Sequence, residues 1–140
     1  MSGFVLDTSV AIAWYLPETF TPEARRWQAR LLAGDDRFVV PRLHYWEMAN
    51  VLRTAVLRRR LTESLAREIW ALHLDAPLEI VEPASAEVLA RTLELGATAY
   101  DAVFVELALS LDLQLLTAER VSRPWVAKLG ARAVVVGAET

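Results

Sequence analysis

The sequence contains no cysteine, only two histidines and no long apolar run. Without cysteine the chain forms no disulfides and offers no thiolate ligands, and this composition suits a reducing compartment. No stretch approaches the roughly 18 apolar residues that a membrane-spanning helix needs, and no basic segment precedes the first apolar run near the N-terminus. We therefore expect no membrane anchor and no export signal, and a cytoplasmic location.

Apolar residues, by contrast, are abundant and make up 54% of the 140 residues. A chain of this size and composition is typical of one compact domain with a substantial core. We find no internal repeat, low-complexity segment or linker-like tract, and we predict a single domain over residues 1–140. The net charge of -3 gives no general basic signature of nucleic-acid binding. It leaves open a local basic groove, or a cation that bridges acids to phosphate.

Short apolar runs alternate with segments of helical spacing along the chain. The predicted strands are 4–6, 38–40, 78–81, 115–116 and 133–136, and the predicted helices are 10–16, 21–33, 43–59, 63–76, 85–95, 101–111 and 124–129. Thr62 and Gly96 are expected to cap helices, and the apolar stripe of helix 63–76 is assigned to Leu65, Ile69, Leu72 and Leu74. Such alternation favours a three-layer α/β/α sandwich with a central parallel sheet of four to five strands.

Four acids occupy places where this fold gathers ligands. Asp7 follows the first strand, Glu119 follows the strand 115–116, Asp101 opens a helix, and Glu47 lies early in the helix after the second strand. In open parallel sheets, ligands bind beyond the carboxyl ends of the strands. Glu47 and Asp101 also have apolar neighbours, among which an unpaired carboxylate is costly to bury. Oxygen ligands of this kind suit Mg²⁺ or Mn²⁺ better than zinc.

Each of these acids also has a structural interpretation. Asp7 and Asp101 would be favoured at helix N-termini by the helix dipole, Glu47 would be solvated, and Glu119 would belong to a turn after a strand. Other acids are assigned to structure alone, with Asp112 as a cap, Glu106 on the surface and residues 35–36 in a turn. The run 58–60 of arginines is either a solvated helix end or a contact to RNA.

Four segments resemble the PIN domain, specifically the VapC-type toxins of bacterial and archaeal toxin–antitoxin pairs. They are Phe4-Val5-Leu6-Asp7-Thr8-Ser9-Val10, Glu47-Met48-Ala49-Asn50-Val51-Leu52, Ala99-Tyr100-Asp101-Ala102 and Leu115-Leu116-Thr117-Ala118-Glu119-Arg120. The resemblance implies a PIN-type parallel sheet and an Mg²⁺-dependent endoribonuclease, with Mn²⁺ as a substitute metal. It also implies a small VapB-type antitoxin as partner, a homodimer and a toxin–antitoxin hetero-oligomer.

Position by position, Asp7, Glu47 and Asp101 match the family's metal-binding acids, and Ser9 matches the hydroxyl beside the first of them. Glu119 departs from the family's usual aspartate, which moves its carboxylate by about one C–C bond, roughly 1.5 Å. We assign catalytic and metal-binding roles to these four acids. Supporting roles are assigned to Ser9, Thr117 and Asn50, and contacts to RNA are assigned to Arg120 and Arg123.

The implied mechanism is hydrolysis of an RNA phosphodiester bond by metal-activated water, which leaves 5′-phosphate and 3′-hydroxyl ends. Two alternatives remain. A phosphotransfer domain of the haloacid-dehalogenase type would use Asp7 as nucleophile, but such domains require a second aspartate at the position where this chain has Ser9. A PIN-like module that has lost turnover through Glu119 would act only by binding RNA or protein.

Overall fold

The computed structural model describes residues 3–137, which form a five-stranded sheet in the order β3-β2-β1-β4-β5. Every neighbouring pair of strands is parallel. The strands are β1 (Gly3–Leu6), β2 (Arg37–Val40), β3 (Glu79–Ile80), β4 (Gln114–Thr117) and β5 (Ala133–Val135). The predicted parallel sheet is confirmed, with β3 reduced to two exposed residues at the edge.

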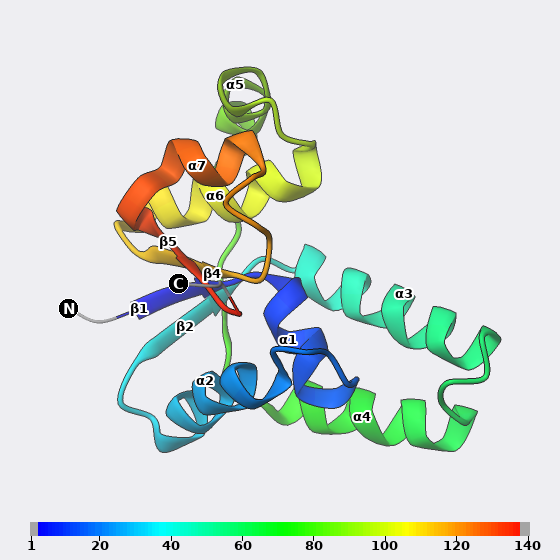
Figure 1. Cartoon of the computed structure of the whole chain (residues 1–140). Coiled ribbons are helices and arrows are strands. Elements are labelled where there is room, and N and C mark those ends of the chain that lie inside the picture. The colour runs from blue at the N-terminus through cyan, green and yellow to red at the C-terminus, as the bar shows by residue number, and fades with distance from the viewer. Residues whose placement is uncertain (1–2, 138–140) are drawn as a thin grey trace.

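Helices cover both faces of this sheet, which confirms the three-layer α/β/α architecture (Figure 1). One layer contains α1 (Thr8–Tyr15), α2 (Thr21–Ala33), α3 (Leu43–Leu57) and α4 (Glu63–Asp75). The other contains α5 (Ser85–Leu95), α6 (Ala99–Leu111) and α7 (Pro124–Leu129), and a short 3-10 turn, Gly130–Arg132, precedes β5. None of the helices in the described part of the chain has the length and apolarity to cross a membrane.

The central strand β1 joins the two apolar cores because its side chains alternate between the faces of the sheet. Phe4 and Leu6 pack with Val10 and Trp14 in the core between the sheet and helices α1 and α2. Val5 packs in the other core, with residues of α6 and α7. All four residues of β1 are buried, as expected for a strand covered on both faces. The polar residues that follow β1 therefore stand at the rim of a rigid, buried strand.

The α3–α4 hairpin carries the main error of the sequence prediction. The face of α4 that is buried consists of Ala66, Ile69 and His73. Leu65, Leu72 and Leu74, which were assigned to the apolar stripe, are each more than 40% exposed. Helical spacing alone does not distinguish a stripe through residue 72 from one through residue 73. The choice depends on polar partners for His73 that only the folded chain provides.

Both predicted helix caps are confirmed. The Thr62 hydroxyl accepts a hydrogen bond from the Leu65 amide at 3.1 Å, which satisfies one of the free N–H groups at the start of α4. Gly96 ends α5 in the left-handed conformation, with φ of 66°, which glycine adopts at low cost. These ends fix where each helix meets the sheet.

Candidate functional site

Asp7 lies at the centre of the site because β1 and β4 are neighbours that end at the same edge. Leu6 pairs with Leu116, so Asp7 stands beside Thr117, the last residue of β4. The Thr117 hydroxyl donates to Asp7 Oδ2 at 2.7 Å, and the Ser9 hydroxyl donates to the same oxygen at 2.8 Å. Ser9 Oγ also accepts from the Ala118 amide at 3.0 Å. Asp7 is thus held by both strands.

Glu47 and Asp101 are held in a similar way, each by a threonine. Thr8, the first residue of α1, donates its hydroxyl hydrogen to Glu47 Oε1 at 2.8 Å across to α3. Thr98 caps α6, and its hydroxyl contacts both the Asp101 amide and Asp101 Oδ2 at 3.2 Å. Each acid is therefore oriented by a hydroxyl group rather than by a charged partner.

One carboxylate oxygen of each acid remains free of hydrogen bonds from the described residues. All such bonds to these acids fall on Oδ2 of Asp7, Oε1 of Glu47 and Oδ2 of Asp101. The ion pairs within residues 3–137 involve acids other than Asp7, Glu47 and Asp101. Each of the three carboxylates thus has one open oxygen and, within the described residues, no ion-paired cation. Negative charge at this edge of the sheet is therefore uncompensated.

The pKa values of the three acids are all raised, chiefly by burial. Burial raises the pKa of Asp7 from 3.8 to about 6 against the hydrogen bonds from Thr117 and Ser9, and the charges of Asp101 and Glu119 raise it further. Burial also raises the pKa of Glu47, opposed by the Thr8 hydrogen bond and reinforced by Asp7 and Asp101. The four carboxylates therefore act on one another at the same edge of the sheet.

The pKa of Asp101 is raised by burial and lowered by its hydrogen bond from Thr98 and by the charge of Arg123. Arg123 Nε forms an ion pair with Glu119 Oε2 at 3.3 Å, and the Glu119 side chain is about one third exposed. Glu119 thus differs from the other three acids, since it has a guanidinium partner four residues further along the loop that precedes α7. The Glu119 amide donates to Thr117 Oγ1 at 3.0 Å, which ties the loop after β4 to the site.

The donor atoms at this edge of the sheet are carboxylate and hydroxyl oxygens. Within residues 3–137, no three His, Asp or Glu side chains are placed to hold one ion by themselves. Mg²⁺, however, is usually held through one or two carboxylates, with waters and phosphate oxygens completing its shell. Oxygen-only ligands, open carboxylate oxygens and raised pKa values fit a hard divalent cation bound in this way.

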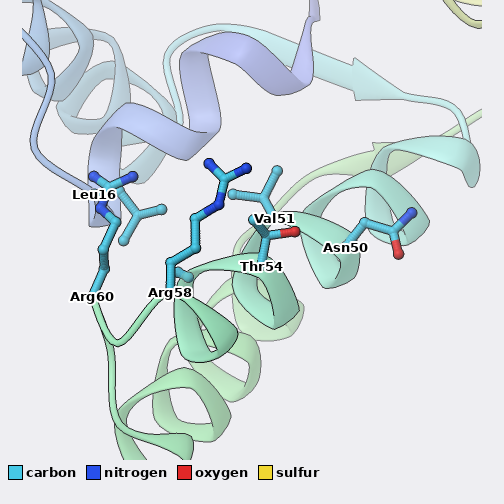
Figure 2. A pocket seen from close by; sticks show the side chains of 7 residues that line it. Leu16, Asn50, Val51, Thr54, Arg58 and Arg60 are labelled. Atoms are coloured by element: carbon cyan, nitrogen blue, oxygen red, sulfur yellow. The ribbon is translucent and has the colours of Figure 1, made fainter.

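A hollow lined by Asn50, Thr54, Arg58 and Arg60 lies beside the second half of α3 (Figure 2). Asn50 lies three residues after Glu47, which places it nearly one helical turn further along α3. Leu16, at the end of α1, forms part of the opposite wall. Of the arginine run 58–60, the first and third line this hollow. Arg120 lines a second hollow with Phe20 and Val121.

Two features near the site were missed from sequence, and one acid outside the site was misassigned. The sequence pattern assigns no role to the two histidines, His44 and His73, yet both are fully buried. Thr8 was not assigned a role, although its position directly after Asp7 was a signal. Glu106 was assigned to the surface, which is wrong: it is 4% exposed and accepts a hydrogen bond from Arg91 at 2.7 Å.

Comparisons with known proteins agree with this architecture. The PIN domain family matches residues 4–122. Ribonuclease VapC3 from Pyrobaculum aerophilum is 32% identical over 126 residues, which cover 83% of this chain and 88% of that protein. The crystal structure of PAE2754 from Pyrobaculum aerophilum superposes with a TM-score of 0.73 at 21% identity, covering 96% of this chain and 84% of that one.

A second solved structure shares the same fold. VapBC2 from Rickettsia felis, bound to a DNA fragment from its promoter, gives a TM-score of 0.63 at 12% identity and covers 95% of this chain and 96% of that one. The family match and the VapC relative each span most of the sequence. The chain therefore belongs to the PIN-domain family.

Proposed function

We propose that this protein is a VapC-type endoribonuclease that needs Mg²⁺, with Mn²⁺ as a substitute, and that it is the toxin of a type II toxin–antitoxin system. The observation that carries the proposal is the set of three hydroxyl-oriented carboxylates, each with an open oxygen, at one edge of a PIN fold. The 32% identity to a ribonuclease VapC supports the nuclease class.

In this proposal, Asp7, Glu47 and Asp101 would hold the cation together with water and phosphate oxygens, and not all three by direct bonds. Glu119 would act directly or through water. When bound, such a cation polarises a phosphodiester oxygen and acidifies a nearby water. Ser9 and Thr117 fix the Asp7 carboxylate, and Thr98 fixes that of Asp101, so the ligands are oriented before substrate arrives.

RNA would reach these acids along basic and polar surface on α3 and in the loop after β4. Asn50, three residues after Glu47, lines a hollow together with Arg58 and Arg60. Arg123 lies close enough to lower the pKa of Asp101. Guanidinium groups contact phosphates independently of base sequence. Arg120 and Arg123 remain our proposed RNA contacts, and Arg58 and Arg60 extend that surface.

The proposed partners are a VapB-type antitoxin and a second copy of the chain, which together form a hetero-oligomer in the cytoplasm. The similarity of the fold to that of a solved VapBC assembly supports a VapB-type partner. Co-expression with a candidate VapB-type antitoxin, followed by size-exclusion chromatography with light scattering, tests both the complex and its stoichiometry.

The decisive experiment follows RNA cleavage by purified protein under controlled metal conditions. We expect cleavage with Mg²⁺ or Mn²⁺, none in excess EDTA, and recovery when either metal is restored. The products should carry 5′-phosphate and 3′-hydroxyl ends. Equal cleavage in EDTA would contradict the metal requirement. An Asp7→Asn preparation, purified in parallel, controls for contaminating ribonucleases.

A second function, a PIN-like module that binds RNA or protein without cleaving, is favoured by one feature. Glu119 replaces the family's usual aspartate, and its carboxylate is paired with Arg123. That module would bind RNA in filter or gel-shift assays yet show no cleavage with Mg²⁺ or Mn²⁺. Restored cleavage in Glu119→Asp would identify the longer side chain as the cause.

A further inference from the structure

A continuous series of hydrogen bonds runs from the site into the α3–α4 hairpin. Glu47 Oε1 accepts from the Thr8 hydroxyl at 2.8 Å, and Thr8 Oγ1 lies 2.9 Å from His44 Nδ1. His44 Nε2 lies 2.7 Å from His73 Nε2, and His73 Nδ1 lies 2.8 Å from the Tyr15 hydroxyl. The series thus joins α1, α3 and α4.

The two imidazoles are closed off from bulk solvent. Both rings are fully buried, and the His73 ring lies 6.0 Å from that of Trp14, 5.8 Å from that of Tyr45 and 5.4 Å from that of Tyr15. Within the described residues, no buried side-chain nitrogen or oxygen lacks a hydrogen-bond partner. The polar atoms of this series must therefore satisfy one another.

The number of hydrogens fixes the direction of every bond. An ionised Glu47 can only accept, so the single hydroxyl hydrogen of Thr8 goes to it. His44 must then donate from Nδ1 to Thr8 and accept at Nε2 from His73. His73 consequently accepts at Nδ1 from the Tyr15 hydroxyl. The reverse order would place a threonine lone pair against the Glu47 carboxylate.

Both imidazoles are neutral in this arrangement. Burial lowers the pKa of His44 to about 3, helped by the nearby His73, and burial lowers the pKa of His73 to about 4. Each ring therefore carries one hydrogen at neutral pH, which is what a one-directional series requires. Aligned hydrogen bonds polarise one another, so the series strengthens the final bond to Glu47.

We infer that Tyr15, His73, His44 and Thr8 form a one-directional hydrogen-bond chain that positions the Glu47 carboxylate for cation binding. His44 and His73 are thus positioning residues, which act through Thr8 and do not touch the cation. The inference rests on the proposed function for the role of Glu47, while the direction of the chain is a separate observable. No zinc site is needed to explain why two histidines are buried.

The first test reads the tautomers directly. Because the sequence has only two histidines, a ¹⁵N–¹H multiple-bond correlation spectrum shows just two imidazoles. In metal-free protein at neutral pH we expect His44 to carry hydrogen on Nδ1 and His73 to carry it on Nε2. Hydrogen on Nε2 of His44, or a charged ring at either position, overturns the chain. This readout does not involve RNA cleavage.

The second test measures Mn²⁺ binding by calorimetry in the absence of RNA. Thr8→Val removes the hydroxyl and should weaken binding by about tenfold or more, the usual effect of losing an outer partner of a metal ligand. Thr8→Ser restores the hydroxyl and should recover most of the affinity. Tyr15→Phe cuts the chain at its far end and should weaken binding by only about twofold, since the effect passes through three bonds.

A matched control separates positioning from general loss of stability. Glu106→Gln perturbs a buried polar pair in another layer and should leave Mn²⁺ affinity unchanged. Should Thr8→Val fail to fold, Tyr15→Phe still tests the chain. Because the Glu47 end fixes the direction of the bonds, His44 and His73 should keep their wild-type tautomers in Tyr15→Phe. A switched tautomer of either ring in Tyr15→Phe, or wild-type affinity in folded Thr8→Val, overturns the inference.

The two proposals fail in distinguishable ways. Mn²⁺ binding and RNA cleavage with the opposite tautomers would overturn the chain and leave the nuclease standing. No Mn²⁺ binding and no cleavage by wild-type protein would overturn the proposed function, and the positioning role with it, even if the tautomers are as expected.

Discussion

Asp7 and Glu106 are both buried carboxylates, but only the charge of Glu106 is compensated by a cationic side chain among the described residues. Glu106 is 4% exposed and accepts from Arg91 at 2.7 Å, so a guanidinium compensates its charge. Asp7 is 8% exposed, and within the described residues it accepts only from two hydroxyl groups and is paired with no cationic side chain. Hydroxyl groups orient a carboxylate without neutralising it. The comparison separates an acid built for structure from one prepared for a cation.

The largest expected effect comes from neutralising the uncompensated acids. Asp7→Asn or Asp101→Asn should reduce Mg²⁺-dependent RNA cleavage by at least about 100-fold, since each removes a charged metal ligand. The fold should be retained, and Asp7→Asn should be as stable as wild type or more so because a buried charge is lost. Cleavage rates and thermal unfolding by circular dichroism check both points. Near-wild-type cleavage in Asp7→Asn would break the comparison.

The pH dependence of stability provides the next test, on metal-free protein in EDTA. The pKa of Asp7 is about 6 when folded and 3.8 ordinarily, so the native state binds the extra proton between these values. Stability contributed by Asp7 should therefore fall as pH rises from about 4 to 6, by a total of about 3 kcal/mol. Above this range, the ionised group remains destabilising.

Urea unfolding at several pH values, with Asp7→Asn as reference, isolates this contribution from other acids. The difference in unfolding free energy between variant and wild type should grow as pH rises through the range. Added Mg²⁺ should reduce the difference at neutral pH, because a ligand that binds only the native state stabilises it. Identical pH dependence in the two proteins would show that Asp7 is not buried as an uncompensated acid.

Glu106→Gln tests the other side of the comparison. The variant weakens the ion pair with Arg91 and should cost about 1–2 kcal/mol of stability, less than for a fully buried pair because Arg91 is partly exposed and also bonds Glu94. RNA cleavage should stay at the wild-type rate. Denaturant unfolding and cleavage assays measure the two effects. A loss of cleavage without a loss of stability would place Glu106 in the site.

The smallest effect is expected at Glu119, which is neither compensated in a buried pair like Glu106 nor uncompensated like Asp7. Glu119→Asp should keep cleavage within about threefold of wild type or raise it, since the exposed pair with Arg123 contributes little. Cleavage rates at saturating Mg²⁺ provide the measurement. A collapse of activity would mean that the site requires the longer side chain.

The order of elements was predictable because it follows from local pattern. Strands 4–6 and 38–40 are short apolar runs, and Gly96 closes a helix as expected. The buried face of α4 was not predictable, because His73 replaces Leu72 there only when His44 and Tyr15 supply partners. Those partners lie 29 and 58 residues away in the chain. Local spacing carries no information about such contacts.

Local sequence pattern specifies the alternation of strands and helices and the positions of Asp7 and Glu119 after strands, since apolar runs and breakers act locally. Which acids remain uncompensated depends instead on contacts between segments that are distant in the chain. Glu47 and Glu106 both lie among apolar neighbours in helices, yet one meets Thr8 and the other meets Arg91. The physical reason is that a buried charge takes its character from partners in space, and the fold alone selects them.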